Sequence, residues 1–186
     1  MKSRQNAGIK VASSGTATFR FDNGLLDWLR EESEQKRTSL NTLVTQVLQS
    51  HAEYHTFAAR AGMISMPKAL IIALIEKLEP QELIKLAEHV AKNELKDTVL
   101  MMKTRYTPDT VLEFIDSWAR VAGFAYRHHV KNGDGSKIIH SIMLQHDMGE
   151  RWSLYFVELF KFAFKAFDIK IDFQNTANTI SVDVEV

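Results

Sequence analysis

Residues Thr16 to Tyr54 carry more apolar faces than a segment of this length can bury. Thr16 to Phe21 alternates strictly between polar and apolar side chains, which is the period of a half-buried strand. Two amphipathic stretches follow and predict helices, the first opening at Asp22 or Asn23 and the second at Ser39. The main apolar side chains of these elements are Phe19, Phe21, Leu25, Trp28, Leu29, Leu43, Val44 and Val47. A monomer of about 40 residues cannot cover so many, so this segment is expected to fold as a dimer.

Dimerisation would turn the polar face of the predicted strand into part of a two-chain binding surface. Two strands would pair antiparallel into a ribbon, with four helices closed over its apolar face. The opposite face would then present Thr16, Thr18 and Arg20 from both chains. A two-stranded ribbon fits the major groove of B-DNA, where Arg binds guanine and Thr meets base edges. These three residues are therefore predicted to contact bases.

The start of the second predicted helix is a candidate phosphate contact. Ser39, Leu40 and Asn41 combine free backbone amides, the positive end of the helix dipole and short polar side chains. Phosphate contacts fix the position of a protein on DNA, whereas base contacts give sequence specificity. The segment thus contains both parts of a DNA-binding surface.

The segment resembles the ribbon-helix-helix family of transcriptional repressors. The resemblance is carried by Thr16-Ala-Thr-Phe-Arg-Phe-Asp22, Leu25-Leu-Asp-Trp-Leu29 and Thr38-Ser-Leu-Asn-Thr-Leu-Val44, about a fifth of the chain. It implies a homodimer or higher even oligomer on double-stranded DNA. In such a dimer the polar strand residues contact bases, and the second helix clamps phosphate through Ser39, the Leu40 backbone and Asn41. One departure is that Lys36-Arg37-Thr38 replaces the Gly often found between the two helices.

The first 15 residues predict a flexible basic tail before the module, which we place at residues 16–57. Lys2, Arg4 and Lys10 lie in this tail without any acidic residue, although the whole chain has 23 basic and 23 acidic side chains. These three side chains are additional candidate DNA contacts. Basic tails also occur in proteins that bind no nucleic acid, and Thr16–Asp22 can alternatively be an ordinary strand of an α+β domain.

The rest of the chain predicts a helical linker region over residues 63–105 and a C-terminal α+β domain over residues 106–186. Thr107-Pro108 opens a helix, and a hairpin over Phe124–Gln145 turns near Asn132-Gly133. An aromatic helix over Glu150–Phe167 and two alternating strands, Asp168–Gln174 and Thr179–Val186, complete the domain. The predicted fold class is α+β with an antiparallel sheet, and the domain is expected to sense an effector or to assemble oligomers.

The aromatic helix and four histidines are the candidate effector sites. The helix is apolar beyond one face, which is typical of a buried core helix, a dimer contact or the wall of a pocket for an apolar ligand. His128, His140 and His146, with Asp147 or Glu150, suit nickel, zinc or copper. They resemble the sites of metal-responsive ribbon-helix-helix repressors such as the nickel regulators, although those include a cysteine and this chain has none. The alternative is scattered or hydrogen-bonded histidines. Since His128 and His129 are adjacent on a strand, at most one joins a given site.

Composition and missing motifs restrict the function classes. The absence of cysteine favours a reducing cytoplasm, and neither an apolar leader nor a membrane-length apolar stretch is present. No nucleophile elbow, P-loop or dinucleotide-binding turn occurs, so the sequence indicates no enzyme and requires no cofactor. We expect a dimeric, DNA-binding transcriptional regulator with a small-molecule or metal effector. The alternatives are an antitoxin-like interaction protein, or a ligand-binding or metal-binding protein whose ribbon only dimerises.

Overall fold

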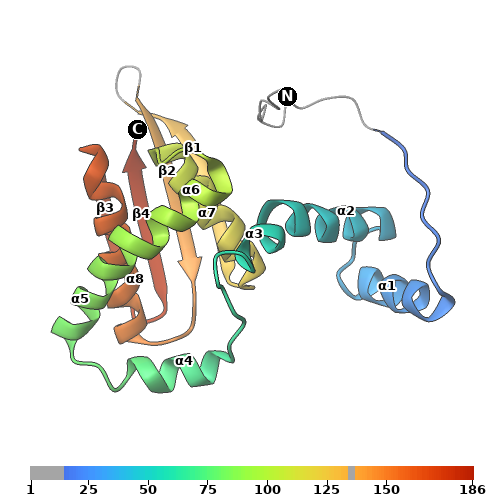
Figure 1. Ribbon diagram of the computed structural model, residues 1–186, viewed down its shortest axis with the longest axis horizontal. Coiled ribbons are helices and arrows are strands. Elements are labelled where there is room, and N and C mark those ends of the chain that lie inside the picture. Colours follow the sequence, from blue (N-terminus) through green and yellow to red (C-terminus); the bar gives the residue numbers. More distant parts are fainter. Residues whose placement is uncertain (1–14, 134–136) are drawn as a thin grey trace. The chain divides into compact units, whose positions relative to one another are not determined.

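The computed structural model describes residues 15–133 and 137–186, and it divides the chain into two compact units, Met1–Gln46 and Val47–Val186. The α+β class is confirmed, because helices are combined with a four-stranded antiparallel sheet near the C-terminus (Figure 1). The predicted tail, with Lys2, Arg4 and Lys10, lies outside the described residues except for Gly15. Within the described ranges no helix has both the length and the apolar character needed to cross a bilayer.

The first unit contains an extended segment followed by helices that begin where the sequence predicts. Helix α1 spans Asn23–Gln35 and α2 spans Leu40–Ser50, with the unit boundary inside α2. The Oδ1 atom of Asp22 caps α1 by accepting from the amide of Leu25 at 2.9 Å. The Oγ atom of Ser39 caps α2 in the same way, accepting from the amide of Thr42 at 3.0 Å.

The predicted strand at Thr16–Phe21 is not formed in the single chain. Residues 15–22 have no regular secondary structure, and all of them are exposed. A strand of a two-chain ribbon makes its hydrogen bonds to the other chain, so an isolated chain offers it no partner. The fold class is thus confirmed only for the helices and the C-terminal sheet, and the ribbon stays a proposal.

The turn between α1 and α2 uses a non-glycine residue in the left-handed region. Arg37 has φ 51°, and its amide donates to the carbonyl of Glu34 at 2.9 Å. The amide of Thr38 donates to the carbonyl of Ser33, also at 2.9 Å. This is the helix-ending geometry that glycine adopts most easily, so Arg37 holds the conformation expected of the Gly that the sequence lacks.

Replacing Arg37 by glycine is expected to raise the free energy of unfolding of the first unit by about 0.5–1 kcal/mol, because glycine has no Cβ penalty at positive φ. Chemical denaturation followed by circular dichroism measures the change. Arg37→Ala is the matched control, since it removes the same side chain but keeps the Cβ. Equal effects of the two variants would contradict a backbone origin.

The second unit begins with a series of helices, and these include the predicted linker region. A π-helical turn at His51–His55 and the short α3 at Thr56–Ala58 extend α2. The following elements are α4 at Lys68–Ile75, α5 at Pro80–His89, a π-helical turn at Val90–Leu95, α6 at Lys96–Lys103 and α7 at Pro108–Val121. Within residues 63–105, α5 buries Leu83 and Ala87 and packs against α8, Glu150–Phe164. The observed boundary, after Gln46, also lies before the predicted end of the module at residue 57.

The sheet consists of two hairpins. Strands β1 (Ala125–Asn132) and β2 (Ile138–Gln145) form the first, and β3 (Lys170–Asn175) and β4 (Thr179–Glu185) form the second. The order β1-β2-β4-β3 places β2 beside β4, and every pairing is antiparallel. A short 3-10 turn, Lys165–Phe167, joins α8 to the second hairpin.

Helices α7 and α8 cover one face of the sheet (Figure 1). The alternation predicted for the last strand is confirmed, because Ile180, Val182 and Val184 are at most 2% exposed. Ile142 and Leu144 of β2 share this buried face through the β2–β4 register. The core between sheet and helices therefore lies directly beneath the aromatic face of α8.

Candidate functional site

The two phenylalanines of residues 16–21 lie near each other, and the polar residues of the same segment are exposed. The rings of Phe19 and Phe21 lie on the same side, with centroids 6.3 Å apart. Thr16, Thr18 and Arg20 are exposed. Within residues 15–133 and 137–186 the Arg20 guanidinium makes no salt bridge, whereas Arg30 pairs with Asp27 at 3.1 Å. Arg20 is therefore available to an external anion or base.

The start of α2 has the free amides that a phosphate contact needs. The hydroxyl of Ser39 is engaged as the cap and lies 2.7 Å from the Thr42 hydroxyl. The amides of Leu40 and Asn41 precede the first intrahelical hydrogen bonds, and Asn41 is exposed. Ser39 therefore orients the helix start, while the next two residues supply the donors.

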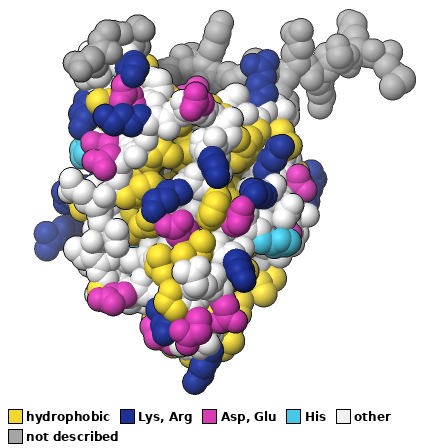
Figure 2. Space-filling view, turned by 90° about the vertical axis from the view of Figure 1, so that its left-hand side faces the viewer, with side chains coloured by type: hydrophobic (Ala, Val, Ile, Leu, Met, Phe, Trp, Pro, Cys, Tyr) yellow, Lys and Arg dark blue, Asp and Glu magenta, His cyan; other side chains and the backbone are white. Residues whose placement is uncertain are grey.

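Charge on the second unit is mixed. Figure 2 shows Lys and Arg side chains interspersed with Asp and Glu side chains and with apolar ones over one face. Binding to a DNA backbone requires basic side chains gathered on one surface. The face drawn in Figure 2 does not have that distribution.

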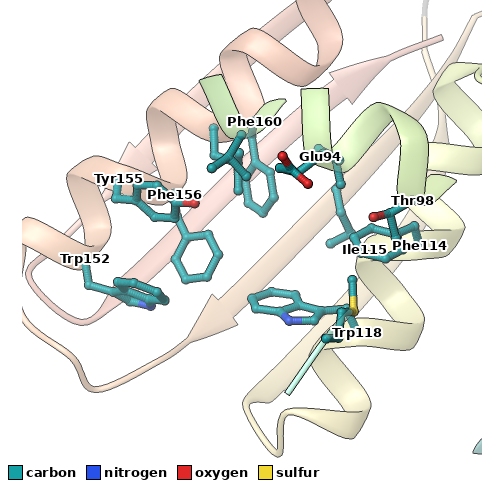
Figure 3. A pocket seen from close by; sticks show the side chains of 13 residues that line it. Glu94, Thr98, Phe114, Ile115, Trp118, Trp152, Tyr155, Phe156 and Phe160 are labelled. Carbon is teal, nitrogen blue, oxygen red and sulfur yellow. The ribbon is translucent and has the colours of Figure 1, made fainter. Parts of the chain in front are cut away.

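The second unit contains an aromatic pocket with a volume of about 220 Å³ between α7, α8 and residues 90–98. Its walls include Trp118 from α7 and Trp152, Tyr155, Phe156 and Phe160 from α8 (Figure 3). Phe156 is central, with ring centroids 5.2 Å from Trp118 and 4.8 Å from Trp152. The aromatic helix of the sequence is thus both a core element and a pocket wall.

One residue of this pocket has a buried polar atom that lacks a partner among the described residues. The Nε1 atom of Trp152 is buried and makes no hydrogen bond within the described part of the chain. Trp118, Trp152 and Met63 also border a second cavity of about 500 Å³, beneath the segment that joins α3 to α4. The indole N–H of Trp152 is therefore a buried, unpaired donor on a residue that borders both cavities.

His128 and His140 are brought together, whereas His146 lies elsewhere. The Nε2 atom of His128 is 2.9 Å from the Nδ1 atom of His140, and its Nδ1 is 3.0 Å from the Oδ1 atom of Asp116. The hydroxyl of Tyr126 also donates to Asp116. Burial, followed by the neighbouring His128, lowers the pKa of His140. Burial, followed by the hydrogen bond to Asp116, raises the pKa of Tyr126.

His146 is buried and both of its ring nitrogens are engaged. Nδ1 accepts from the amide of Met148 at 3.1 Å, and Nε2 lies 2.9 Å from the Oγ atom of Ser153. The Ser153 hydroxyl donates its one proton to the carbonyl of Thr176 at 2.7 Å, so it accepts from Nε2–H. The ring is therefore neutral, and burial, opposed by Asp147 and aided by Lys68, lowers its pKa.

A metal centre does not emerge from this arrangement. Among residues 15–133 and 137–186 no group of three or more His, Asp or Glu side chains is placed to hold a metal ion. Both ring nitrogens of His146 are hydrogen-bonded, to the Met148 amide and the Ser153 hydroxyl. The facing nitrogens of His128 and His140 are hydrogen-bonded to each other.

Sequence reasoning missed several residues of these sites, among them Asp116, Trp118 and Glu94. Asp116 sits four residues after Leu112 on the apolar side of α7, and a carboxylate in that position was a usable signal for a buried polar partner. Trp118 and Glu94 border the aromatic pocket, but they come from helices far from α8 in the sequence. No periodicity within one element indicates such a convergence.

No protein-family model and no curated protein sequence matches the chain.

Proposed function

We propose that the protein is a cytoplasmic, sequence-specific DNA-binding regulator that acts as a homodimer, with a ribbon formed by residues 16–21 of two chains. The main observation in favour of this proposal is a pair of exposed aromatic rings in the first unit. Phe19 and Phe21 are 60% and 38% exposed and lie on one side of a segment that leads directly into α1. Exposed rings of this size, gathered on one face, indicate an interface.

The helices of the first unit support a dimer. Trp28 and Leu25 of α1 are 58% and 41% exposed. Like the two phenylalanines, they are apolar side chains of the first unit that the single chain leaves exposed to solvent and that a second chain would bury. A second copy supplies it through a two-fold axis, since each chain offers both a strand and two helices.

The opposite side of the segment supports DNA as the partner. Arg20 has no salt bridge within the described residues, and Thr18 is exposed beside it. In the dimer these side chains would repeat across the two-fold axis, which matches a palindromic site. The free amides of Leu40 and Asn41 would then hold a phosphate on each side.

Arg20→Ala is expected to weaken binding to a selected operator by about 1–3 kcal/mol, because one base-reading guanidinium is lost. The operator is obtained by selection from random duplexes with the full chain, and affinity is measured by fluorescence anisotropy over a range of salt concentrations. Thr18→Ala tests in the same way whether Thr18 also contacts a base.

Arg30→Ala is the matched control for charge, since Arg30 is exposed on α1 and paired with Asp27. It is expected to change affinity little. A steep loss of affinity with salt is expected of the parent protein. A dimer that selects no duplex, or equal losses for Arg20→Ala and Arg30→Ala, would contradict base reading and favour a ribbon that only dimerises.

A further inference from the structure

We propose that the aromatic pocket of the second unit binds an uncharged bicyclic aromatic molecule that carries one hydrogen-bond acceptor. This inference goes beyond DNA binding and does not depend on it, because every residue that it uses lies in residues 47–186. It rests on the size of the pocket, the nature of its walls, the buried unpaired donor of Trp152 and the charge of its lining.

The size of the pocket fits a small ring system. A cavity of about 150 Å³ lined by apolar side chains can stay dry and take up benzene. The volume here is about 220 Å³. Two fused rings fill such a space better than one, while a molecule much larger would have to displace Phe156 or Phe160 from the core.

The walls favour flat aromatic molecules. Trp118 and Phe156 turn their rings toward each other, and Phe156 and Phe160 stack with centroids 5.8 Å apart (Figure 3). A planar ligand among these rings gains offset-stacked and edge-to-face contacts beyond simple burial of apolar area.

Trp152 supplies the directional contact. A buried indole N–H without an acceptor is destabilising relative to a bonded one, and buried Trp normally finds a partner. The Nε1 atom of Trp152 has none within the described residues. A ligand acceptor, such as a ring nitrogen or a carbonyl oxygen, would remove that cost.

The charge of the lining argues for a neutral ligand. Glu94 is the ionisable acid among the described residues around the pocket, and those residues include no Lys, Arg or His (Figure 3). An anionic ligand would meet a carboxylate without a compensating cation. A protonated amine would bring donors rather than the acceptor that Trp152 requires.

Quinoline and naphthalene are a matched pair of probes, because they have the same shape and only quinoline carries an acceptor. Each is titrated at pH 7.5 into the full chain, and binding is followed by ligand-observed NMR, with tryptophan fluorescence as a second readout. Quinoline is expected to bind about 2–10-fold more tightly than naphthalene, the range of one net hydrogen bond. Naphthalene-2-carboxylate tests the charge and is expected to bind more weakly than either.

Two variants locate the site. Trp152→Phe keeps an aromatic wall but removes the N–H, so the preference for quinoline is expected to disappear. Leu159→Trp adds bulk at a partly exposed residue of this pocket that does not border the larger cavity, so binding of both probes is expected to be lost. Met143→Leu, exposed on the other face of the sheet, is the control for both.

Three results would overturn the proposal: no binding of either probe, equal binding of both to the parent protein, or full binding to a folded Leu159→Trp protein. The last result would place the ligand in the larger neighbouring cavity. None of these measurements involves DNA. Failure here therefore leaves the proposed DNA function standing, and failure to bind DNA leaves this proposal standing.

Discussion

Replacing Phe19 and Phe21 together by alanine is expected to convert the protein to a monomer and to reduce operator affinity by about 10²–10⁴-fold. The two side chains are on average about half exposed in one chain. Burying a whole Phe side chain contributes about 1.5–3 kcal/mol. The dimer contains two copies of each phenylalanine, so four side chains that are each about half exposed become buried. The dimer therefore loses about 3–6 kcal/mol. Analytical ultracentrifugation and operator binding measure the two effects on the same samples.

The opposite face of the same six residues provides the control. Thr18→Ala with Arg20→Ala changes two exposed side chains that alternate with the phenylalanines. That variant is expected to stay dimeric while losing DNA affinity. A Phe19→Ala/Phe21→Ala protein that remains dimeric at micromolar concentration would contradict the ribbon. Loss of the dimer in both variants would mean that the two faces do not have separate roles.

Local signals predicted the elements of this fold well because the physical causes are local. Asp22 and Ser39 cap the helices that their positions indicated, since a cap needs only a side-chain oxygen and amides three residues ahead. The alternation of Ile180, Val182 and Val184 likewise predicted their burial, because one face of the sheet is covered by helices.

Elements that depend on distant partners could not be predicted in the same way. The strand at residues 16–21 was inferred from its period, but a strand forms only where a second strand supplies hydrogen bonds. Within residues 63–105, α5 packs on α8, which lies more than sixty positions later in the chain, and no pattern inside α5 indicates that partner.

The candidate sites show the same division between local and distant causes. His128 and His140 lie on the two strands of one hairpin, and their rings meet although His128 is opposite Ile142 and His140 is opposite Val130 in the register. The pocket depends on Trp118, Trp152 and Glu94, which come from three different helical elements. The indole N–H of Trp152 is unpaired because no acceptor packs against it among the described residues. No sequence pattern indicates such a detail of packing.

The His146 network is expected to make the second unit less stable in mildly acidic solution. The neutral ring accepts from Met148 and donates to Ser153, and protonating Nδ1 would break the first bond. Burial lowers the pKa of His146 below its ordinary value near 6.5, and the pKa of His140 is lowered too. The unfolded chain therefore binds more protons than the folded one below about pH 6.5.

The sign of the pH dependence follows from this difference. The stabilising contribution is complete above the unfolded pKa and is lost as the pH falls toward the folded pKa. Each histidine can contribute a slope of at most about 1.4 kcal/mol per pH unit within that window. Urea unfolding at pH 7.5, 6.5 and 5.5, followed by circular dichroism, measures it.

His146→Leu separates the hydrogen-bonding role from the titration. At pH 7.5 the variant is expected to lose about 2–4 kcal/mol, because the Met148 amide is left buried without an acceptor and Ser153 loses a donor. Its stability is expected to fall less steeply below pH 6.5 than that of the parent protein, since one of the two titrating groups has gone. His129→Gln, at an exposed residue of β1, is expected to alter neither quantity. An unchanged slope in His146→Leu would assign the acid sensitivity to His140, because the pKa of that residue is lowered as well.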